Sequence, residues 1–233
     1  MTTHRFFVPP EALAGDTFPV PPSIAHQVTR VLRLGDGQEL VLLDGLGGQA
    51  RCRLEGSATR LRVVERGHAA GEPRHRLTIW QALLKGDGLE RVIQQGTELG
   101  VARFRLLLTS RCVVRELSPR RVDRLRAIAR ESAEQSERGI VPDVEGPFAL
   151  AVASHPGAVL LFERMTPGGA RLGALKPPDE LIVGPEGGFD PAEVAAADEA
   201  GVRIAGLGPR ILRSESVAIA AAAVVLSGTG DFA

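Results

Sequence analysis

Two short glycine turns near the C-terminus hold the residues best suited to chemistry. Residues 184–188 (GPEGG) follow the apolar run 181–183, and residues 206–209 follow the short predicted strand 202–205. Glycine has no Cβ, so such turns let the main chain approach a ligand and offer it N–H and C=O groups. Open α/β sheets build ligand sites at turns of this kind. The pair predicts backbone recognition of a base or ribose, although ordinary strand-to-helix connections have the same composition.

Motifs for other common cofactors are incomplete. Gly86 and Gly206 each begin a G-x-G pattern after an apolar run, but Arg91 and Ile211 stand where a dinucleotide fingerprint has its third small residue. The chain has no phosphate-binding P-loop motif and no nucleophile elbow. Its His and Cys residues match no metal-ligand spacing, so we expect no metal site.

Two of these stretches are similar to the signature of a known family. GPEGG at 184–188 and LGPRILRSES at 207–216 resemble the motifs of RsmE-type 16S ribosomal RNA methyltransferases, members of the SPOUT superfamily that bind S-adenosylmethionine. The resemblance implies an N-terminal PUA-like β-barrel for RNA, residues 1–72. It also implies an α/β methyltransferase domain with a C-terminal trefoil knot, residues 73–233, working as a homodimer.

The same resemblance implies a cofactor site made of three loops. Carried over by position, these are residues 161–163, 184–187 and 207–212. We expect their main-chain groups to hold the adenine of S-adenosylmethionine between apolar walls. The predicted cofactor-binding residues are Leu161, Phe162, Glu163, Gly184, Pro185, Glu186, Gly187, Leu207, Gly208, Ile211 and Leu212.

The implied reaction is methyl transfer to N3 of a uridine in 16S ribosomal RNA, and the expected partner is this RNA within the small ribosomal subunit. Uridine N3 carries a proton near neutral pH, so attack requires proton loss and support for the charge that spreads onto O2 and O4. Arginine is always charged and donates several hydrogen bonds, which makes Arg138 and Arg213 the predicted catalytic residues. Glu134 or Glu215 would accept the proton, and either carboxylate also suits a structural role.

Charge is distributed unevenly along the chain. The formal net charge is zero, with 28 basic and 28 acidic side chains. Residues 73–140 carry 14 basic and 8 acidic groups, whereas residues 141–233 carry 6 and 12. A basic middle segment is typical of a face that binds RNA phosphates, although an Arg-rich solvated helix leaves the same pattern.

Residues expected to contact RNA come from three places. His26, Arg30 and Arg33 recur at about one helical turn and share a polar side. The family has a similar His-x-x-x-Val-Leu-Arg element in its RNA-holding domain, matched by residues 26–33 if one extra spacer position is allowed. Arg111 follows a predicted strand as in the family, and Gln135 belongs to a stretch similar to its Ala-Glu-Gln-Ser-x-Arg motif. Without the resemblance, His26, Arg30 and Arg33, and the polar stretch that contains Gln135, would be assigned to solvated surface.

Composition indicates a soluble protein with a sizeable core, at 44% hydrophobic and 24% charged residues. Only 4% are aromatic, which argues against base stacking as the main way of holding RNA. Cys52 and Cys112 are expected to be packing residues in a reducing compartment. The start of the sequence lacks the apolar core of a signal peptide, so none is expected, and the longest apolar run, residues 217–226, is too short to cross a bilayer. We expect a cytoplasmic protein without membrane contact.

Two other functions fit the sequence. One is a protein that holds ribosomal RNA without catalysis. The other is a SPOUT methyltransferase with a different RNA target.

The first seventy residues are typical of a small barrel. Strands are expected at residues 5–8, 38–43, 50–54 and 60–65. A helix at residues 24–34 interrupts them, with Ser23 as its cap. Its buried face is expected to comprise Ile24, Val28, Val31 and Leu32.

Beyond a linker at residues 68–75, strands alternate with helices, which places a domain boundary near residue 72. Strands are expected at residues 76–84, 104–108, 158–162, 181–183 and 202–205. Helices are expected at residues 89–99, 119–138, 191–200 and 214–226. Gly100 and Gly139 should end the first two, and Ser118 and Asp190 should cap the second and third.

Overall fold

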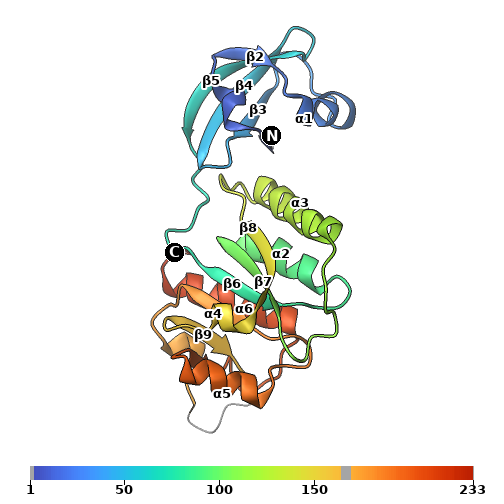
Figure 1. The fold of residues 1–233 in the computed structure, drawn as a ribbon. Helices are drawn as coiled ribbons and strands as arrows, with labels where there is room; N and C mark the ends of the chain where they lie inside the picture. The colour runs from blue at the N-terminus through green and yellow to red at the C-terminus, as the bar shows by residue number, and fades with distance from the viewer. Residues whose placement is uncertain (1–2, 164–168, 233) are drawn as a thin grey trace. The chain divides into compact units, whose positions relative to one another are not determined.

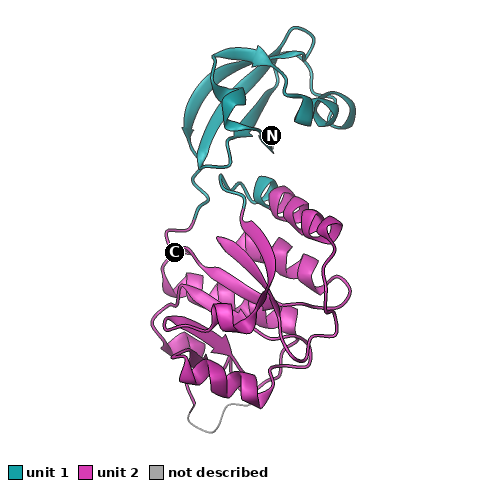
Figure 2. Cartoon of the chain, in the orientation of Figure 1, with its two compact units in different colours: residues 1–72, 133–141 teal, residues 73–132, 142–233 magenta. Residues whose placement is uncertain are grey.

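The chain folds into two compact units (Figure 2). The computed structural model describes residues 3–163 and 169–232. The first unit comprises residues 1–72 and 133–141, and the second comprises residues 73–132 and 142–233. The division near residue 72 was expected from the sequence, whereas the return of residues 133–141 to the first unit was not.

The first unit is built on one five-stranded sheet of order β1-β3-β4-β5-β2. β1 runs parallel to β3, and the other neighbours are antiparallel. The strands are β1 (His4–Phe7), β2 (Thr17–Pro19), β3 (Glu39–Leu43), β4 (Gly48–Glu55) and β5 (Arg60–His68). A 3-10 turn, η1 (Pro10–Leu13), joins β1 to β2. β2 was not predicted, because a three-residue strand ending in proline gives little periodic signal.

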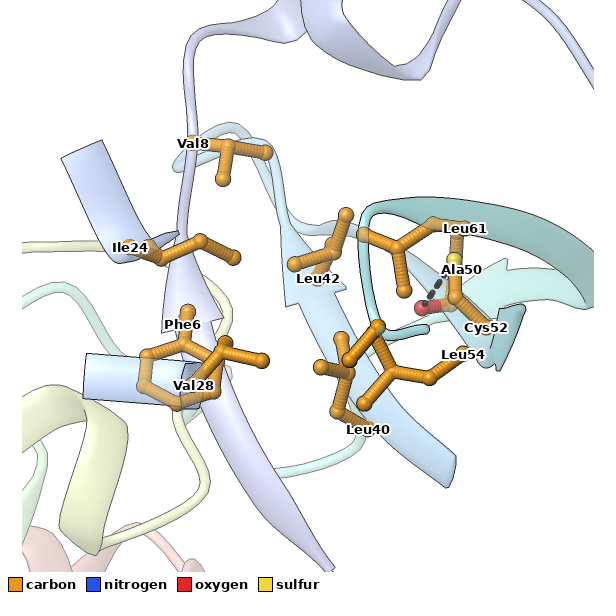
Figure 3. Close-up of a cluster of buried hydrophobic side chains, with 11 residues drawn as sticks. Phe6, Val8, Ile24, Val28, Leu40, Leu42, Ala50, Cys52, Leu54 and Leu61 are labelled. Carbon is orange, nitrogen blue, oxygen red and sulfur yellow. Dashed lines mark hydrogen bonds between the residues drawn. The ribbon is translucent and has the colours of Figure 1, made fainter. Parts of the chain in front are cut away.

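Both faces of β3 are buried. Leu40 and Leu42 pack into the cluster of Figure 3, together with Phe6 and Val28. Val41 and Leu43 point to the opposite face, as alternation along a strand requires, and pack in a second cluster that includes Ala133. The residues that follow position 132 therefore supply part of the core of the first unit.

The helix of the first unit differs from its prediction. α1 (Pro22–His26) has Pro21 at its N-cap and Pro22 at its first position, so Ser23 is not the cap. A π-helical turn, η2 (Gln27–Val31), follows, in which Leu32 N–H donates to the Gln27 carbonyl at 2.9 Å. A π turn holds more residues than an α turn. Val31 is consequently rotated outward and is 62% exposed instead of buried.

The second unit has a six-stranded sheet of order β11-β9-β10-β6-β7-β8, in which every neighbouring pair is parallel (Figure 1). Its central strands are buried on both faces, as is usual for parallel sheets. Its strands are β6 (Thr78–Ala82), β7 (Arg103–Leu108), β8 (Asp143–Ala149), β9 (Ala158–Leu161), β10 (Glu180–Val183) and β11 (Arg203–Ala205). β8 was not predicted, because its glycine and proline interrupt the pattern.

Among the described residues, four α-helices connect these strands, and a fifth, α6, follows β11 and packs against α2, β10 and β6. They are α2 (Gly88–Leu99), α3 (Pro119–Gln135), α4 (Leu150–Ala153), α5 (Pro191–Glu199) and α6 (Ser214–Gly228), with a 3-10 turn, η3 (Leu172–Ala174). α4 was not predicted. Among the described residues, no helix combines the length and the apolar character that crossing a bilayer requires.

Most predicted helix ends are confirmed. Asp190 forms a capping box with Glu193, and Ser118 Oγ accepts from Arg121 N–H at 3.3 Å. Gly100 ends α2 in a left-handed conformation with φ of 104°. The expected end of α3 near residue 138 is wrong, since the helix stops at Gln135.

A trefoil knot is a property of the path of the whole chain. That path includes residues 164–168, which lie outside the described residues. The knot therefore stays a prediction from the family resemblance.

Gly100→Ala is expected to lower the free energy of unfolding more than Gly157→Ala does. Both glycines lie in the second unit with nearly equal positive φ, 104° and 106°. A Cβ at Gly157 meets nothing within 4 Å, whereas one at Gly100 overlaps the Pro73 ring. Both substitutions strain the backbone at a positive φ, and the overlap with Pro73 should lower the free energy of unfolding of Gly100→Ala by a further amount of about 1–3 kcal/mol, the usual cost of overpacking. Urea unfolding measures the difference, and equal losses would contradict the packing of Pro73 on α2.

Candidate functional site

A cavity of about 740 Å³ opens in the second unit beside the ends of β9, β10 and β11. All eleven residues predicted to bind the cofactor line it, as does Arg213. The structure thus brings together three loops that follow one another at intervals of about twenty residues in the sequence. The prediction of a shared loop site at the strand ends agrees with this geometry, and ligand contacts by individual residues stay predictions.

Strand register puts the three loops side by side. Val183 of β10 pairs with Leu161 of β9, and Leu161 also pairs with Ala205 of β11. Phe162 N–H continues this pairing by donating to the Ala205 carbonyl at 2.9 Å. Because the strands are parallel and end at one level, their following loops must meet at one edge of the sheet.

Two glycines of these loops are required by the geometry. Gly208 has φ of 118°, which L side chains rarely adopt. Gly184 is confined differently, since a Cβ there would lie 3.0 Å from a carbon of the Phe189 ring. Phe189 is buried and lines the cavity, so it has little freedom to move away.

The glycine turn at residues 184–188 is held from its sides by polar groups. Glu186 Oε1 accepts from Lys85 N–H at 2.8 Å. Arg111 donates from Nη1 to the Gly187 carbonyl and from Nη2 to Asp190 Oδ2, each at 3.2 Å. The Ala192 N–H, and after it the Arg111 guanidinium, hold the pKa of Asp190 below its usual value.

Arg111 therefore has intramolecular partners at the edge of the site. It does not line the cavity, and its expected contact with RNA stays a prediction. The structure gives it a role that sequence reasoning missed, which is to tie the segment after β7 to the glycine turn.

The cavity is lined by charges of both signs. The basic groups are Lys85, Arg91, Arg210 and Arg213, and the acidic groups are Asp87, Glu163, Glu186 and Glu215. Arg91 and Asp87 pair with each other at 2.9 Å.

Several lining residues were assigned no role from the sequence. These are Lys85, Asp87, Gly88, Arg91, Val183, Gly188, Phe189, Arg210, Ser214 and Val217. The glycines at 86 and 88 could have indicated that the segment after β6 also belongs to the site. β6 is the neighbour of β10 in the sheet, so this segment begins next to the glycine turn at 184–188.

Arg138 belongs to the first unit and not to the cavity lining. Its side chain is only 2% exposed and pairs with Glu72 through Nη2–Oε2 at 2.8 Å and Nε–Oε1 at 3.2 Å. Glu72 Oε1 also accepts from Ile140 N–H at 3.0 Å. These contacts are those of a buried structural ion pair, and the catalytic assignment of Arg138 stays a prediction.

The neighbouring Glu134 is also engaged within the first unit. Its Oε1 accepts from Phe7 N–H at 2.8 Å. Gln135, one residue further and the last of α3, is exposed. Gln135 stays a candidate for RNA contact, whereas Glu134 already supports the start of the sheet.

His26, Arg30 and Arg33 are exposed, as a solvated or RNA-facing surface requires. They do not lie on one regular helix, because η2 changes the turn and Arg33 adopts φ of 53°. Their contact with RNA stays a prediction.

Among the described residues, no group of three or more His, Cys, Asp or Glu side chains is placed to hold a metal ion. Cys52 and Cys112 are both free and buried. Burial raises the pKa of the Cys52 thiol to about 11, so this thiol is not a nucleophile at neutral pH.

Two sequence families match the chain. The family described as an RNA methyltransferase domain matches residues 71–226. The family described as an RNA methyltransferase PUA domain matches residues 24–65.

Relatives from several bacteria align along most of the chain. The ribosomal RNA small subunit methyltransferase E of Synechocystis sp. is 35% identical over 91% of this chain and 73% of its own length. Its Mycobacterium bovis counterpart is 35% identical over 88% and 82%, and the Bacillus subtilis protein is 30% identical over 90% and 89%.

Solved structures resemble the whole fold. The Neisseria gonorrhoeae ribosomal RNA small subunit methyltransferase E bound to S-adenosyl methionine superposes with a TM-score of 0.87 at 28% identity, covering 97% of this chain and 98% of its own. A putative methyltransferase of Legionella pneumophila in complex with the same cofactor has a TM-score of 0.84 at 27% identity, with the same coverage.

Arg138→Gln is expected to lower the free energy of unfolding by about 3 kcal/mol, because it leaves the largely buried Glu72 carboxylate without its cation. Arg30→Gln is the matched control in the same unit, and at an exposed site it should change stability by less than about 0.5 kcal/mol. Urea unfolding of both variants provides the measurement. An Arg138→Gln protein as stable as the wild type would overturn the structural assignment and favour the catalytic one.

Proposed function

The chain belongs to the family of ribosomal RNA small subunit methyltransferases E, and on that premise we propose that it methylates N3 of a uridine in 16S ribosomal RNA. S-adenosylmethionine is the proposed methyl donor. The observation that carries the proposal is the cavity, where all the residues that match the family's cofactor loops line one space.

The residues of the cavity suit S-adenosylmethionine. Its volume of about 740 Å³ is in the usual range for small-molecule sites, roughly 300–1,000 Å³. Leu161, Leu207 and Leu212 supply apolar walls, and the glycine turns offer main-chain donors and acceptors. Carboxylates such as Glu163 and Glu215 complement a ligand that carries positive charge. When bound, this cofactor supplies a methyl group already activated by its sulfonium.

The chain's own contribution is to align the uridine, remove its N3 proton and support the resulting charge. Glu215 is the proposed proton acceptor, because it lines the cavity while Glu134 is hydrogen-bonded within the first unit. Arg213 is the proposed donor to the uridine O2 or O4, since its guanidinium belongs to the cavity lining. Its side chain is exposed and makes no ion pair among the described residues, so it is available for this task.

A basic surface next to the cavity supports RNA as the substrate. Arg121 on α3 donates to the Gly86 carbonyl, and Arg124 pairs with Glu90 of α2 at 3.0 Å. These contacts place the Arg-rich first half of α3 beside the turn that contains the cavity residue Lys85. Phosphates on either side of the target base are the proposed ligands of this surface. The PUA domain is proposed to add contacts of its own through His26, Arg30 and Arg33.

We propose that the protein works as a homodimer in the cytoplasm, where the small ribosomal subunit is made. Ile211 in the third loop is 82% exposed, and Leu212 and Val224 are also exposed. Apolar side chains in these positions suit burial against a second copy.

The proposal is tested by combining the purified protein with S-adenosylmethionine and either free 16S ribosomal RNA or small subunits from a strain lacking the modification. Calorimetry should detect cofactor binding, and mapping should find one methyl group on N3 of a single uridine. Absence of cofactor binding together with RNA binding would instead favour a non-catalytic RNA-binding protein. A methyl group on another atom or in another RNA would favour a different target.

Arg213→Gln is expected to lower kcat by about 100-fold or more, the usual loss when one donor to a developing charge is removed. The dissociation constant for S-adenosylmethionine should change little, because the predicted contact is with the uridine. Arg210→Gln is the matched control, a basic side chain of the same loop that also lines the cavity. Equal losses of kcat in both variants would contradict a specific role for Arg213, as would a loss confined to cofactor affinity.

A further inference from the structure

Gln81 is a polar residue in the middle of the apolar core of the second unit. It belongs to β6, all five residues of which are buried, and its own exposure is 0%. It pairs in register with Val183, the last residue of β10 before the glycine turn. Burying an amide group lowers the stability of the fold unless the group is hydrogen-bonded. The hydrogen-bond partners of Gln81 therefore indicate its role.

All the hydrogen bonds of the Gln81 side chain within the described chain are made by its amide nitrogen. Nε2 donates to the Ala82 carbonyl and to Ser214 Oγ, each at 3.0 Å, and lies 3.4 Å from the Gly184 carbonyl oxygen. Oε1 is buried and has no hydrogen-bond partner in the described chain. Gln81 therefore serves this part of the protein as a donor.

Ser214 connects Gln81 to the glycine turn by a second hydrogen bond. Its buried hydroxyl donates to the Gly184 carbonyl. A serine hydroxyl has one hydrogen and rotates to suit its neighbours. When Oγ accepts from Gln81, its hydrogen is directed to Gly184 O, and hydrogen bonds in such a chain strengthen one another.

These two hydrogen bonds, from Gln81 to Ser214 and from Ser214 to the Gly184 carbonyl, form a relay that connects two of the three cavity loops. Gly184 opens the turn at 184–188, and Ser214 begins α6 immediately after the loop that ends at Arg213. Both Gly184 and Ser214 line the cavity, whereas Gln81 does not. Gln81 is thus placed to act on the site only through the other two residues.

We propose that Gln81 is a positioning residue for the cofactor, which keeps the Ser214 hydroxyl on the Gly184 carbonyl and so fixes the spacing of the two loops. This inference rests on the proposed function, because the ligand positioned is S-adenosylmethionine. A loop already held in its binding conformation costs less free energy to order when the ligand arrives. The effect is therefore on cofactor affinity, beyond any effect on stability.

The test compares Gln81→Met with Gln81→Glu. Methionine keeps the length of the side chain and removes the donor, and glutamate replaces the donor by an oxygen that faces two carbonyl oxygens. Calorimetry at a temperature well below the unfolding transition should show S-adenosylmethionine bound roughly fivefold to tenfold more weakly by Gln81→Met, the worth of one hydrogen bond. Gln81→Glu should bind more weakly still.

Two further variants separate positioning from packing. Ile79→Val removes a methyl group from the same buried strand and should lower the melting temperature without changing the affinity for S-adenosylmethionine. Ser214→Thr keeps the hydroxyl and should bind the cofactor more tightly than Ser214→Ala. In the Ser214→Ala background, Gln81→Met should have a smaller effect on affinity than it has alone, because the relay is already broken.

The outcomes are distinct. If Gln81→Met binds the cofactor as tightly as the wild type, the positioning role is overturned even if the melting temperature falls. If the Gln81 variants do not fold, equal affinities of Ser214→Thr and Ser214→Ala overturn it instead. A wild-type chain that binds no S-adenosylmethionine overturns the proposed function and this inference together.

Discussion

Parallel, in-register pairing of four strands is the constraint on which the site depends. β11, β9, β10 and β6 are neighbours in that order, and Ala205, Leu161, Val183 and Gln81 follow one another across the sheet. Parallel strands that end at one level release their loops at the same edge. The cavity exists because the loops after β10 and β11 contain glycines that allow close approach, and because the segments after β9 and β6 complete its lining.

Glycine-rich loops need support from their surroundings, because they contribute few side chains of their own. The turn at residues 184–188 receives it from three directions in the second unit: Gln81 and Ser214 behind it, Lys85 on one side and Arg111 on the other. Each contact uses a main-chain group of the turn or a side chain adjoining it. The apolar and main-chain surface that faces the cavity is thereby left for a ligand, on a scaffold that is ordered before binding.

The sequence predicted the three loops that line the cavity but not the arrangement that unites them. Local signals were sufficient for the capping box at Asp190, the helix stop at Gly100 and the glycine turns, because these depend on neighbouring residues. The outward rotation of Val31 depends on a π turn, which has no periodic signal of its own. The burial of Arg138 beside Glu72 depends on contacts between residues 66 positions apart, and the family motif around it does not distinguish a structural arginine from a catalytic one.

The role of the three loops can be tested with a crystal structure of the full chain in complex with S-adenosylmethionine. We expect the adenosine to be enclosed by residues 161–163, 184–187 and 207–212, with its polar atoms on main-chain groups of these loops and the Gly184 carbonyl still held by Ser214. A cofactor bound elsewhere on the chain, or a cavity that stays empty at saturating cofactor, would contradict it.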